Sequence, residues 1–140
     1  MSAAITATTS DDLERIMDAI GAAARRAATQ LAGTDDVTRN RALLAAAGAL
    51  RAESHTLLEA NRRDVALARD KGLVGAMIDR LALDDGRIEA MARGLEAIAA
   101  LPDPVGRELA RWRVPSGLDI ARVAVPLGVI GIIYESRPNV

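Results

Sequence analysis

The 140-residue sequence contains no cysteine and no phenylalanine, and its aromatic residues are limited to Trp112 and Tyr134. The lack of cysteine excludes a disulfide, a cysteine metal site and a cysteine nucleophile within these residues. The scarcity of aromatic side chains predicts a core of small residues. Each alanine-rich helix then buries little apolar area, so such helices need a broad partner surface.

An excess of charge of either sign is also absent, because 18 basic residues face 19 acidic ones. This balance argues against a nucleic-acid partner, since binding to a polyanion depends on an excess of basic groups. The pairs Arg25–Arg26 and Arg62–Arg63 are interpreted as solvated helix faces. The only histidine, His55, has no ligand-type residues around it in sequence, and no metal site is predicted.

Neither a leader nor a membrane span is indicated. The first ten residues contain neither a basic stretch nor an apolar run, which argues against a signal peptide. The longest apolar stretch, Val123 to Tyr134, contains Pro126 and is too short to cross a bilayer. These features favour a soluble, cytoplasmic protein without a membrane partner.

Apolar residues recur at helical spacing from about residue 10 to residue 101. The first helix is predicted to begin at Ser10 and to end at Gly33. Further helical segments are predicted from Thr34 or Asp35, over residues 57–68, around residues 76–81, and from Asp84 or Asp85. The stripe of the 57–68 segment consists of Leu57, Leu58, Asn61, Val65 and Ala68. Pro102 and Pro104 end the helical region, because a helix interior tolerates neither the lost N–H nor the ring.

From residue 107 onward the pattern is typical of strands. Residues 108–114 and 118–125 alternate apolar with polar side chains around the turn-former Pro115-Ser116-Gly117, which predicts a β-hairpin. Residues 128–134 are apolar on both sides and rich in β-branched side chains, as in a parallel strand covered on both faces. Gly128 and Gly131 are interpreted as allowing close packing against a helix, not as a phosphate loop.

Such a strand needs neighbours on each edge and helices on both faces. The sequence therefore predicts an α/β fold that stops inside its domain: N-terminal helices, a β-hairpin and the first strand of a Rossmann-like parallel sheet.

The final residues carry a specific motif. The stretch Val125-Pro-Leu-Gly-Val-Ile-Gly-Ile-Ile-Tyr-Glu-Ser-Arg-Pro-Asn-Val140 resembles the signature of the glutamyl-phosphate reductase family, within the aldehyde dehydrogenase superfamily. Weaker matches precede it in the family's order, at residues 24–27, at Asn61 with Asp64, and at residues 79–81 and 101–106. The resemblance implies three parts: residues 1–106 as the helical part of an NADP-binding domain, residues 107–125 as an oligomerisation-type hairpin, and residues 126–140 as the first sheet strand with the start of an active-site loop.

The resemblance also implies an activity. Family members use NADPH to reduce L-glutamyl 5-phosphate to L-glutamate 5-semialdehyde with release of phosphate, in proline biosynthesis, and a homo-oligomer is expected for the intact enzyme. Their nucleophile is a cysteine thiolate from a later domain. Because these 140 residues contain no cysteine, the chain alone is expected to be inactive.

Site residues follow from the same resemblance. Asn139 is the catalytic candidate, its amide donating to the oxygen that becomes negative during the reaction; the alternative is an Asn that satisfies loop backbone. The predicted cofactor wall comprises Ile133, Tyr134, Glu135, Ser136 and Arg137, at the carboxyl end of the predicted strand. Arg137 could pair with a substrate carboxylate or phosphate, or equally with Glu135 or a partner surface.

A function of another class stays open. The chain could be a non-enzymatic helical interaction or oligomerisation module that docks through its alanine-rich faces. This alternative explains the helices but leaves residues 128–140 without a purpose. Trp112 in the predicted hairpin could lie at a subunit contact or cover the core of its own domain.

Overall fold

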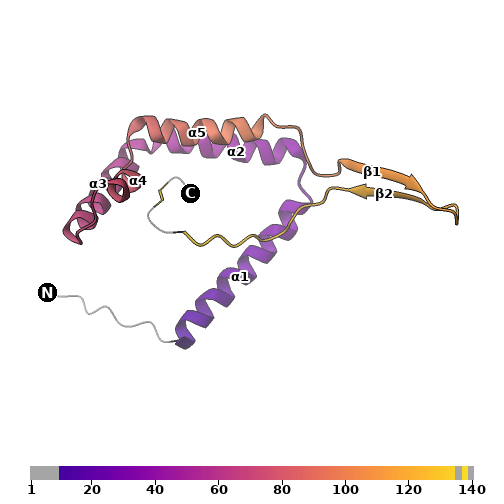
Figure 1. Cartoon of the computed structure of the whole chain (residues 1–140), viewed down its shortest axis with the longest axis horizontal. Helices are drawn as coiled ribbons and strands as arrows, with labels where there is room; N and C mark the ends of the chain where they lie inside the picture. Colours follow the sequence, from indigo (N-terminus) through magenta and orange to yellow (C-terminus); the bar gives the residue numbers. More distant parts are fainter. Residues whose placement is uncertain (1–9, 135–136, 139–140) are drawn as a thin grey trace. The chain divides into compact units, whose positions relative to one another are not determined.

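The computed structural model of the chain describes residues 10–134, Arg137 and Pro138, and within them it contains helices followed by one hairpin (Figure 1). The elements in chain order are α1 (Ser10–Ala32), α2 (Asp36–Ala52), α3 (Ser54–Asp70), α4 (Ala76–Leu81), α5 (Asp85–Ala99), β1 (Glu108–Arg113) and β2 (Asp119–Val123). The predicted helical region and the predicted hairpin are both confirmed.

Two helices begin at aspartate caps that the sequence indicated. The Asp35 carboxylate accepts a hydrogen bond from the Thr38 backbone N–H at 2.8 Å, and the Asp84 carboxylate accepts one from the Arg87 N–H at 2.7 Å. Each bond satisfies a donor that the first helical turn leaves free. Hydrogen bonds from the side chain and backbone of Thr38 lower the pKa of Asp35. The starts of α2 and α5 are thus fixed by local chemistry.

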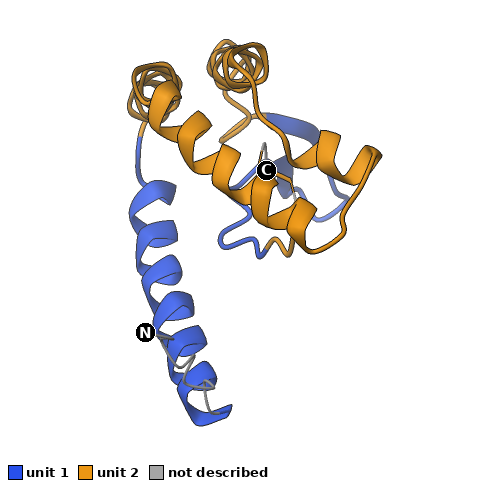
Figure 2. Cartoon of the chain, turned by 90° about the vertical axis from the view of Figure 1, so that its left-hand side faces the viewer, with its two compact units in different colours: residues 1–34, 108–131 blue, residues 35–107, 132–140 orange. Residues whose placement is uncertain are grey.

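The chain divides into two compact units (Figure 2). Unit 1 comprises residues 1–34 and 108–131, and unit 2 comprises residues 35–107 and 132–140.

The core of unit 2 forms where α2 runs along α5 (Figure 1). Ala47 of α2 and Ile88 and Ala92 of α5 are almost completely buried, and α3 adds Val65 and Ala68. Among the described residues, Ile88 is the only large side chain that is almost fully buried. The core is therefore built of small residues, as predicted.

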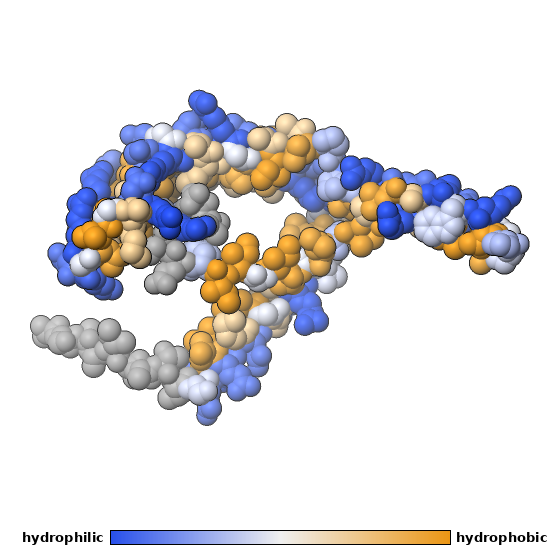
Figure 3. All heavy atoms as spheres, in the orientation of Figure 1, coloured by the Kyte–Doolittle hydropathy of each residue, from blue (hydrophilic) through white to orange (hydrophobic). Residues whose placement is uncertain are grey.

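Unit 1 contains α1, whose apolar stripe is uncovered. No residue of α1 is buried, and its large apolar side chains are half or more exposed (Figure 3): Leu13, Ile16, Met17, Ile20 and Leu31. The opposite side of α1 is charged. An apolar stripe with a charged opposite side is typical of an amphipathic helix that packs on a partner.

The hairpin of unit 1 is antiparallel, with Arg111 opposite Ala121 and Trp112 opposite Ile120. Its turn closes through the Val114 N–H, which donates to the Leu118 carbonyl at 3.0 Å. Gly117 takes a φ of 88°, a left-handed conformation that glycine adopts without steric cost. Arg111 forms ion pairs with Glu108 on its own strand and with Asp119 on the opposite strand, and hydrogen bonds to these carboxylates raise the pKa of Arg111.

The predicted strand at residues 128–134 is not formed in this structure. No described residue of that segment joins a ladder, because no described strand lies beside it to accept its hydrogen bonds. Gly128 has a φ of 86°, and neither Gly128 nor Gly131 has another group near the position of an added Cβ. The interpretation of these glycines as sites of close helix packing is therefore wrong here. At Gly128 the backbone conformation itself requires glycine.

The predicted division into residues 1–106, 107–125 and 126–140 stays a prediction. Within the described part, no helix is both long and apolar enough to cross a membrane.

Candidate functional site: the pocket of unit 2

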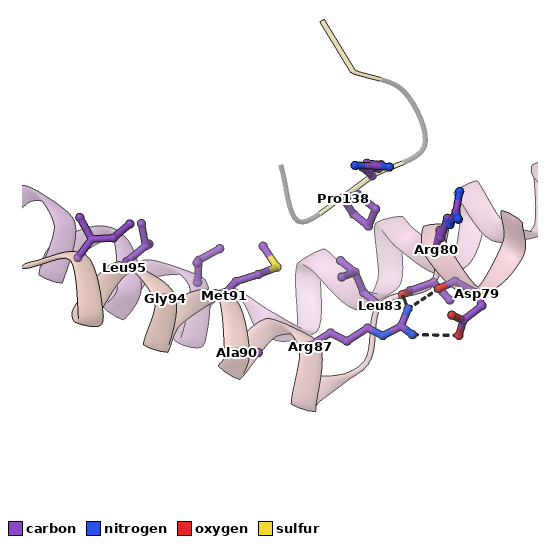
Figure 4. A pocket seen from close by; sticks show the side chains of 13 residues that line it. Asp79, Arg80, Leu83, Arg87, Ala90, Met91, Gly94, Leu95 and Pro138 are labelled. Carbon is purple, nitrogen blue, oxygen red and sulfur yellow. Dashed lines mark hydrogen bonds and ion pairs between the residues drawn. The ribbon is translucent and has the colours of Figure 1, made fainter. Parts of the chain in front are cut away.

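Unit 2 contains an open pocket of about 830 Å³ along α5 and the corner that leads into it (Figure 4). Its apolar lining consists of Leu50, Ala82, Leu83, Ala90, Met91, Gly94, Leu95 and Ile98. Its charged and loop lining consists of Asp79, Arg80, Arg87, Arg137 and Pro138. The pocket thus combines an apolar floor with guanidinium groups, a combination suited to an apolar body bearing an anionic group.

A buried asparagine fixes the corner of this pocket. Asn61 is 7% exposed, and its amide nitrogen donates to the Leu81 carbonyl at 2.8 Å. Its amide oxygen accepts from the Leu83 N–H at 2.7 Å. Both ends of the side chain are satisfied, so burial of this polar group carries no unpaired donor or acceptor. Asn61 therefore ties α3 to the turn that enters α5.

Arg87 ties the same corner from the other side. Its guanidinium donates to the carbonyl of Asp79, to the carbonyl of Ala82 at 2.7 Å, and to the Asp79 carboxylate at 2.9 Å (Figure 4). These bonds satisfy carbonyls near the end of α4 that have no helical partner. The short helix α4 is thus held to the first turn of α5.

Only part of the predicted site can be placed. Ile133 is fully exposed and Tyr134 largely so, and neither lines the pocket. Arg137 lines it together with Pro138, whose ring points toward Leu83 (Figure 4). The remaining predicted residues Glu135, Ser136 and Asn139 lie outside the described residues. The catalytic role of Asn139 and the cofactor wall at residues 133–137 therefore stay predictions.

Known proteins resemble this chain closely. It is 57% identical to the gamma-glutamyl phosphate reductase of Paramagnetospirillum magneticum over 132 residues, which cover 94% of this chain and 31% of that protein. The corresponding protein of Sphingopyxis alaskensis is 60% identical over 121 residues, covering 86% of this chain and 28% of that protein. The chain thus spans about 30% of the length of these curated relatives. No family model matches it.

Solved structures agree with the sequences. A crystal structure of gamma-glutamyl phosphate reductase from Thermotoga maritima matches 83% of this chain with a TM-score of 0.77 and 45% identity, over 28% of its own length. That of the Saccharomyces cerevisiae protein gives the same score at 36% identity, over 30% of its length. The chain is homologous to the gamma-glutamyl phosphate reductases. Its helices and hairpin match the N-terminal region of the reductase structures.

The NADPH expected from the family resemblance needs a group that holds its phosphates and an apolar surface for its rings. A guanidinium such as that of Arg137 suits a phosphate, and the ring of Tyr134 suits an apolar face. Yet among the described members of the predicted wall, Ile133, Tyr134 and Arg137, only Arg137 lines the pocket, and Ile133 and Tyr134 are open to solvent. The described residues of this reductase homologue do not by themselves fit the dinucleotide. No cluster of three or more metal-ligating side chains occurs among them either.

Two residues that shape the pocket were not singled out as site residues from the sequence. Asn61 is a polar member of an otherwise apolar helical stripe, and that position signals a buried, bonded amide. Arg87 carried no such signal. Its partners are the carbonyl of Ala82, five positions earlier, and the carbonyl and carboxylate of Asp79, eight positions earlier, and only the folded corner brings them together.

Proposed function

We propose that the chain forms the N-terminal part of an NADPH-dependent reductase that converts L-glutamyl 5-phosphate to L-glutamate 5-semialdehyde and phosphate. The observation that carries this proposal is the 57% identity to a gamma-glutamyl phosphate reductase over 94% of the chain. The equal TM-scores against the bacterial and the yeast reductase support it, because the likeness holds in fold as well as in sequence.

On this proposal, the 140 residues alone do not catalyse the reaction. Reduction of an acyl phosphate through a covalent intermediate needs a nucleophile, and the cysteine thiolate implied by the family has no counterpart here, because the sequence contains no cysteine. NADPH would supply the hydride when bound. The residues of this chain would contribute one wall of the site.

The proposed roles follow the order of the motif. Asn139 would donate its amide N–H to the oxygen that becomes negative, and residues 133–137 would lie along the cofactor. Arg137 would hold a substrate carboxylate or phosphate, a role supported by its position on the pocket wall. The hairpin β1–β2 would serve a homo-oligomer of the intact enzyme, and a cytoplasmic location fits such a metabolic role.

A chimera tests this proposal. The matched region of the Paramagnetospirillum magneticum reductase is replaced by this chain, and turnover is followed by NADPH absorbance with glutamyl phosphate, or in reverse from the semialdehyde, phosphate and NADP⁺. We expect activity within about tenfold of the parent, and a fall of about 10²- to 10³-fold for Asn139→Ala in the chimera. A folded chimera without turnover would contradict the proposal.

One observation favours the second candidate, an interaction module. The apolar stripe of α1 is uncovered in this chain, and such a stripe is typical of a docking face. The module would leave the chimera inactive while the isolated chain still bound a partner through α1. An active chimera would contradict it as the sole function.

A further inference from the structure

Arg80, in the last turn of α4, lies between two residues that are anchored to other helices. The carbonyl and the carboxylate of Asp79, directly before it, accept hydrogen bonds from the Arg87 guanidinium of α5. The carbonyl of Leu81, directly after it, accepts one from the amide of Asn61 on α3 at 2.8 Å. The backbone that carries Arg80 is thus fixed on both sides, while its own side chain is exposed. Such anchoring suits a binding residue, because less conformational freedom is lost when a ligand is bound.

The lining of the pocket carries more positive than negative charge. Arg80, Arg87 and Arg137 all line it, and Asp79 is the only acidic residue among the described lining residues. Asp79 pairs with Arg87 at 2.9 Å, and Arg87 also holds the carbonyls of Asp79 and Ala82. These two charged groups are therefore committed to the corner of the fold. Arg80 and Arg137 are the groups of the lining that can receive an anion.

The direction of the Arg80 side chain brings it to the side of the pocket opposite these corner bonds. Figure 4 shows that it rises from α4 toward the side on which Pro138 lies, away from the guanidinium of Arg87. Apolar side chains, among them Leu83 and Met91, form the floor of the same pocket. The pocket thus offers a guanidinium at a fixed point and an apolar surface for a short aliphatic chain.

The proposed substrate has a matching arrangement of groups. L-Glutamyl 5-phosphate bears an α-carboxylate near one end of a short aliphatic chain and an acyl phosphate at the other end. Arg137 lies two positions before Asn139, the residue proposed to donate to the reacting oxygen, and therefore belongs with the acyl phosphate. Arg80, on a different element, is then left for the α-carboxylate, whose two oxygens suit the fork of a guanidinium.

We propose that Arg80 is a specificity-determining residue that binds the α-carboxylate of the glutamyl substrate, while the apolar floor of the pocket carries the aliphatic chain. The inference rests on the proposed function and adds the group by which this substrate is distinguished from aldehydes and acyl phosphates without a carboxylate. A site built to pair with a polar group rejects an analogue without that group, because the partner on the protein is then left unpaired.

Steady-state kinetics of the chimera with the Paramagnetospirillum magneticum reductase tests the inference, in the direction that starts from the semialdehyde, phosphate and NADP⁺. We expect Arg80→Ala to raise the KM for L-glutamate 5-semialdehyde about 10- to 100-fold, with kcat within about threefold, because binding to the unreacting end of the substrate is lost. The KM values for phosphate and NADP⁺ should change by less than about twofold. Arg80→Lys, which keeps the charge without the fork, should recover part of the loss.

A substrate without the carboxylate separates lost binding from damage to the fold. For 4-aminobutanal, which lacks only this group, Arg80→Ala should leave kcat/KM within about twofold, so the preference for the semialdehyde should fall by the same factor by which its KM rises. Arg69→Ala is the matched control, because Arg69 is an exposed arginine of α3 that is not part of the pocket lining. It should leave both KM and preference unchanged. Circular dichroism of each variant verifies that the helices are retained.

The outcomes separate this inference from the proposed function. An unchanged KM for the semialdehyde in Arg80→Ala, an equal loss of kcat/KM with both aldehydes, or a loss of preference in Arg137→Ala instead of Arg80→Ala would each overturn the role of Arg80. In each of these cases the activity of the parent chimera leaves the proposed function in place. A folded parent chimera without turnover contradicts the proposed function, and the assignment of Arg80 falls with it.

Discussion

Arg51 of α2 and Glu89 of α5 form a bidentate ion pair. Arg51 Nε lies 2.8 Å from Glu89 Oε2, and Arg51 Nη2 lies 3.1 Å from Glu89 Oε1. The same guanidinium also bonds Glu96, about two turns further along α5, and Arg93 Nε donates to Glu89 at 2.9 Å. Hydrogen bonds from Arg51, and next from Arg93, lower the pKa of Glu89 to about 2. This cluster joins the two helices that form the core of unit 2.

The stability of unit 2 should therefore depend on pH in the acid range. A carboxyl group whose pKa is lower in the folded than in the unfolded state stabilises the fold above its unfolded pKa, and this contribution is lost as pH falls toward the folded pKa. For Glu89 that range runs from its ordinary value of 4.5 down to about 2. We expect the free energy of unfolding, measured by urea denaturation, to fall as pH is lowered through this range.

Glu89→Gln should flatten that dependence, because the amide does not titrate. Glu59→Gln is the matched control, since the Glu59 carboxylate lies 3.8 Å from Arg63 within α3 and does not join two helices. An unchanged pH dependence in Glu89→Gln would show that the pair contributes little, as is common for exposed ion pairs screened by solvent.

The second prediction concerns the buried amide at the pocket corner. Asn61→Ala leaves the Leu81 carbonyl and the Leu83 N–H without their partner, and unsatisfied groups of this kind cost about 1–3 kcal/mol. We expect a loss of that size in the free energy of unfolding. Arg62→Ala, at the adjacent exposed position of α3, should change it by less than about 0.5 kcal/mol. Equal losses in the free energy of unfolding for the two variants would contradict the structural role of Asn61.

Local chemistry explains which parts of the fold could be predicted from the sequence. The starts of α2 and α5 depend on the capping residues Asp35 and Asp84, which directly precede these helices, so the sequence contains the whole signal. The hairpin likewise depends on a short turn and on alternation within residues 108–123. The family-specific motif in residues 125–140 predicted the family, and gamma-glutamyl phosphate reductases are indeed similar to the chain in sequence and in fold.

Features that depend on distant partners could not be predicted in the same way. The apolar pattern of residues 128–134 indicates what a strand would bury, but a ladder requires neighbouring strands, and the described residues supply none beside it. The pairing of Arg51 with Glu89 spans 38 positions, and no local pattern indicates it. Glu135, Ser136 and Asn139 lie outside the described residues, and their roles stay predictions.

The third prediction concerns the core between α2 and α5. Ile88 is almost completely buried, so Ile88→Ala removes its packing and leaves a cavity, at a cost of about 2–5 kcal/mol. Ile98→Ala, on the same helix at 53% exposure, is the matched control and should cost much less. Thermal unfolding followed by circular dichroism at 222 nm compares the two. Similar melting temperatures would mean that the contact between α2 and α5 is not the stabilising core.

The fourth prediction concerns the cap of α5. Asp84→Ala removes the acceptor for the Arg87 N–H and the negative charge at the start of the helix, which should cost about 1 kcal/mol. Asp84→Asn retains a capping oxygen without the charge and should recover most of the loss. Because Arg87 also holds α4, fraying of the first turn of α5 should loosen residues 79–82 as well. Hydrogen exchange of the α4 amides, measured in both variants, checks this coupling; faster exchange confined to α5 would show that the two helices move independently.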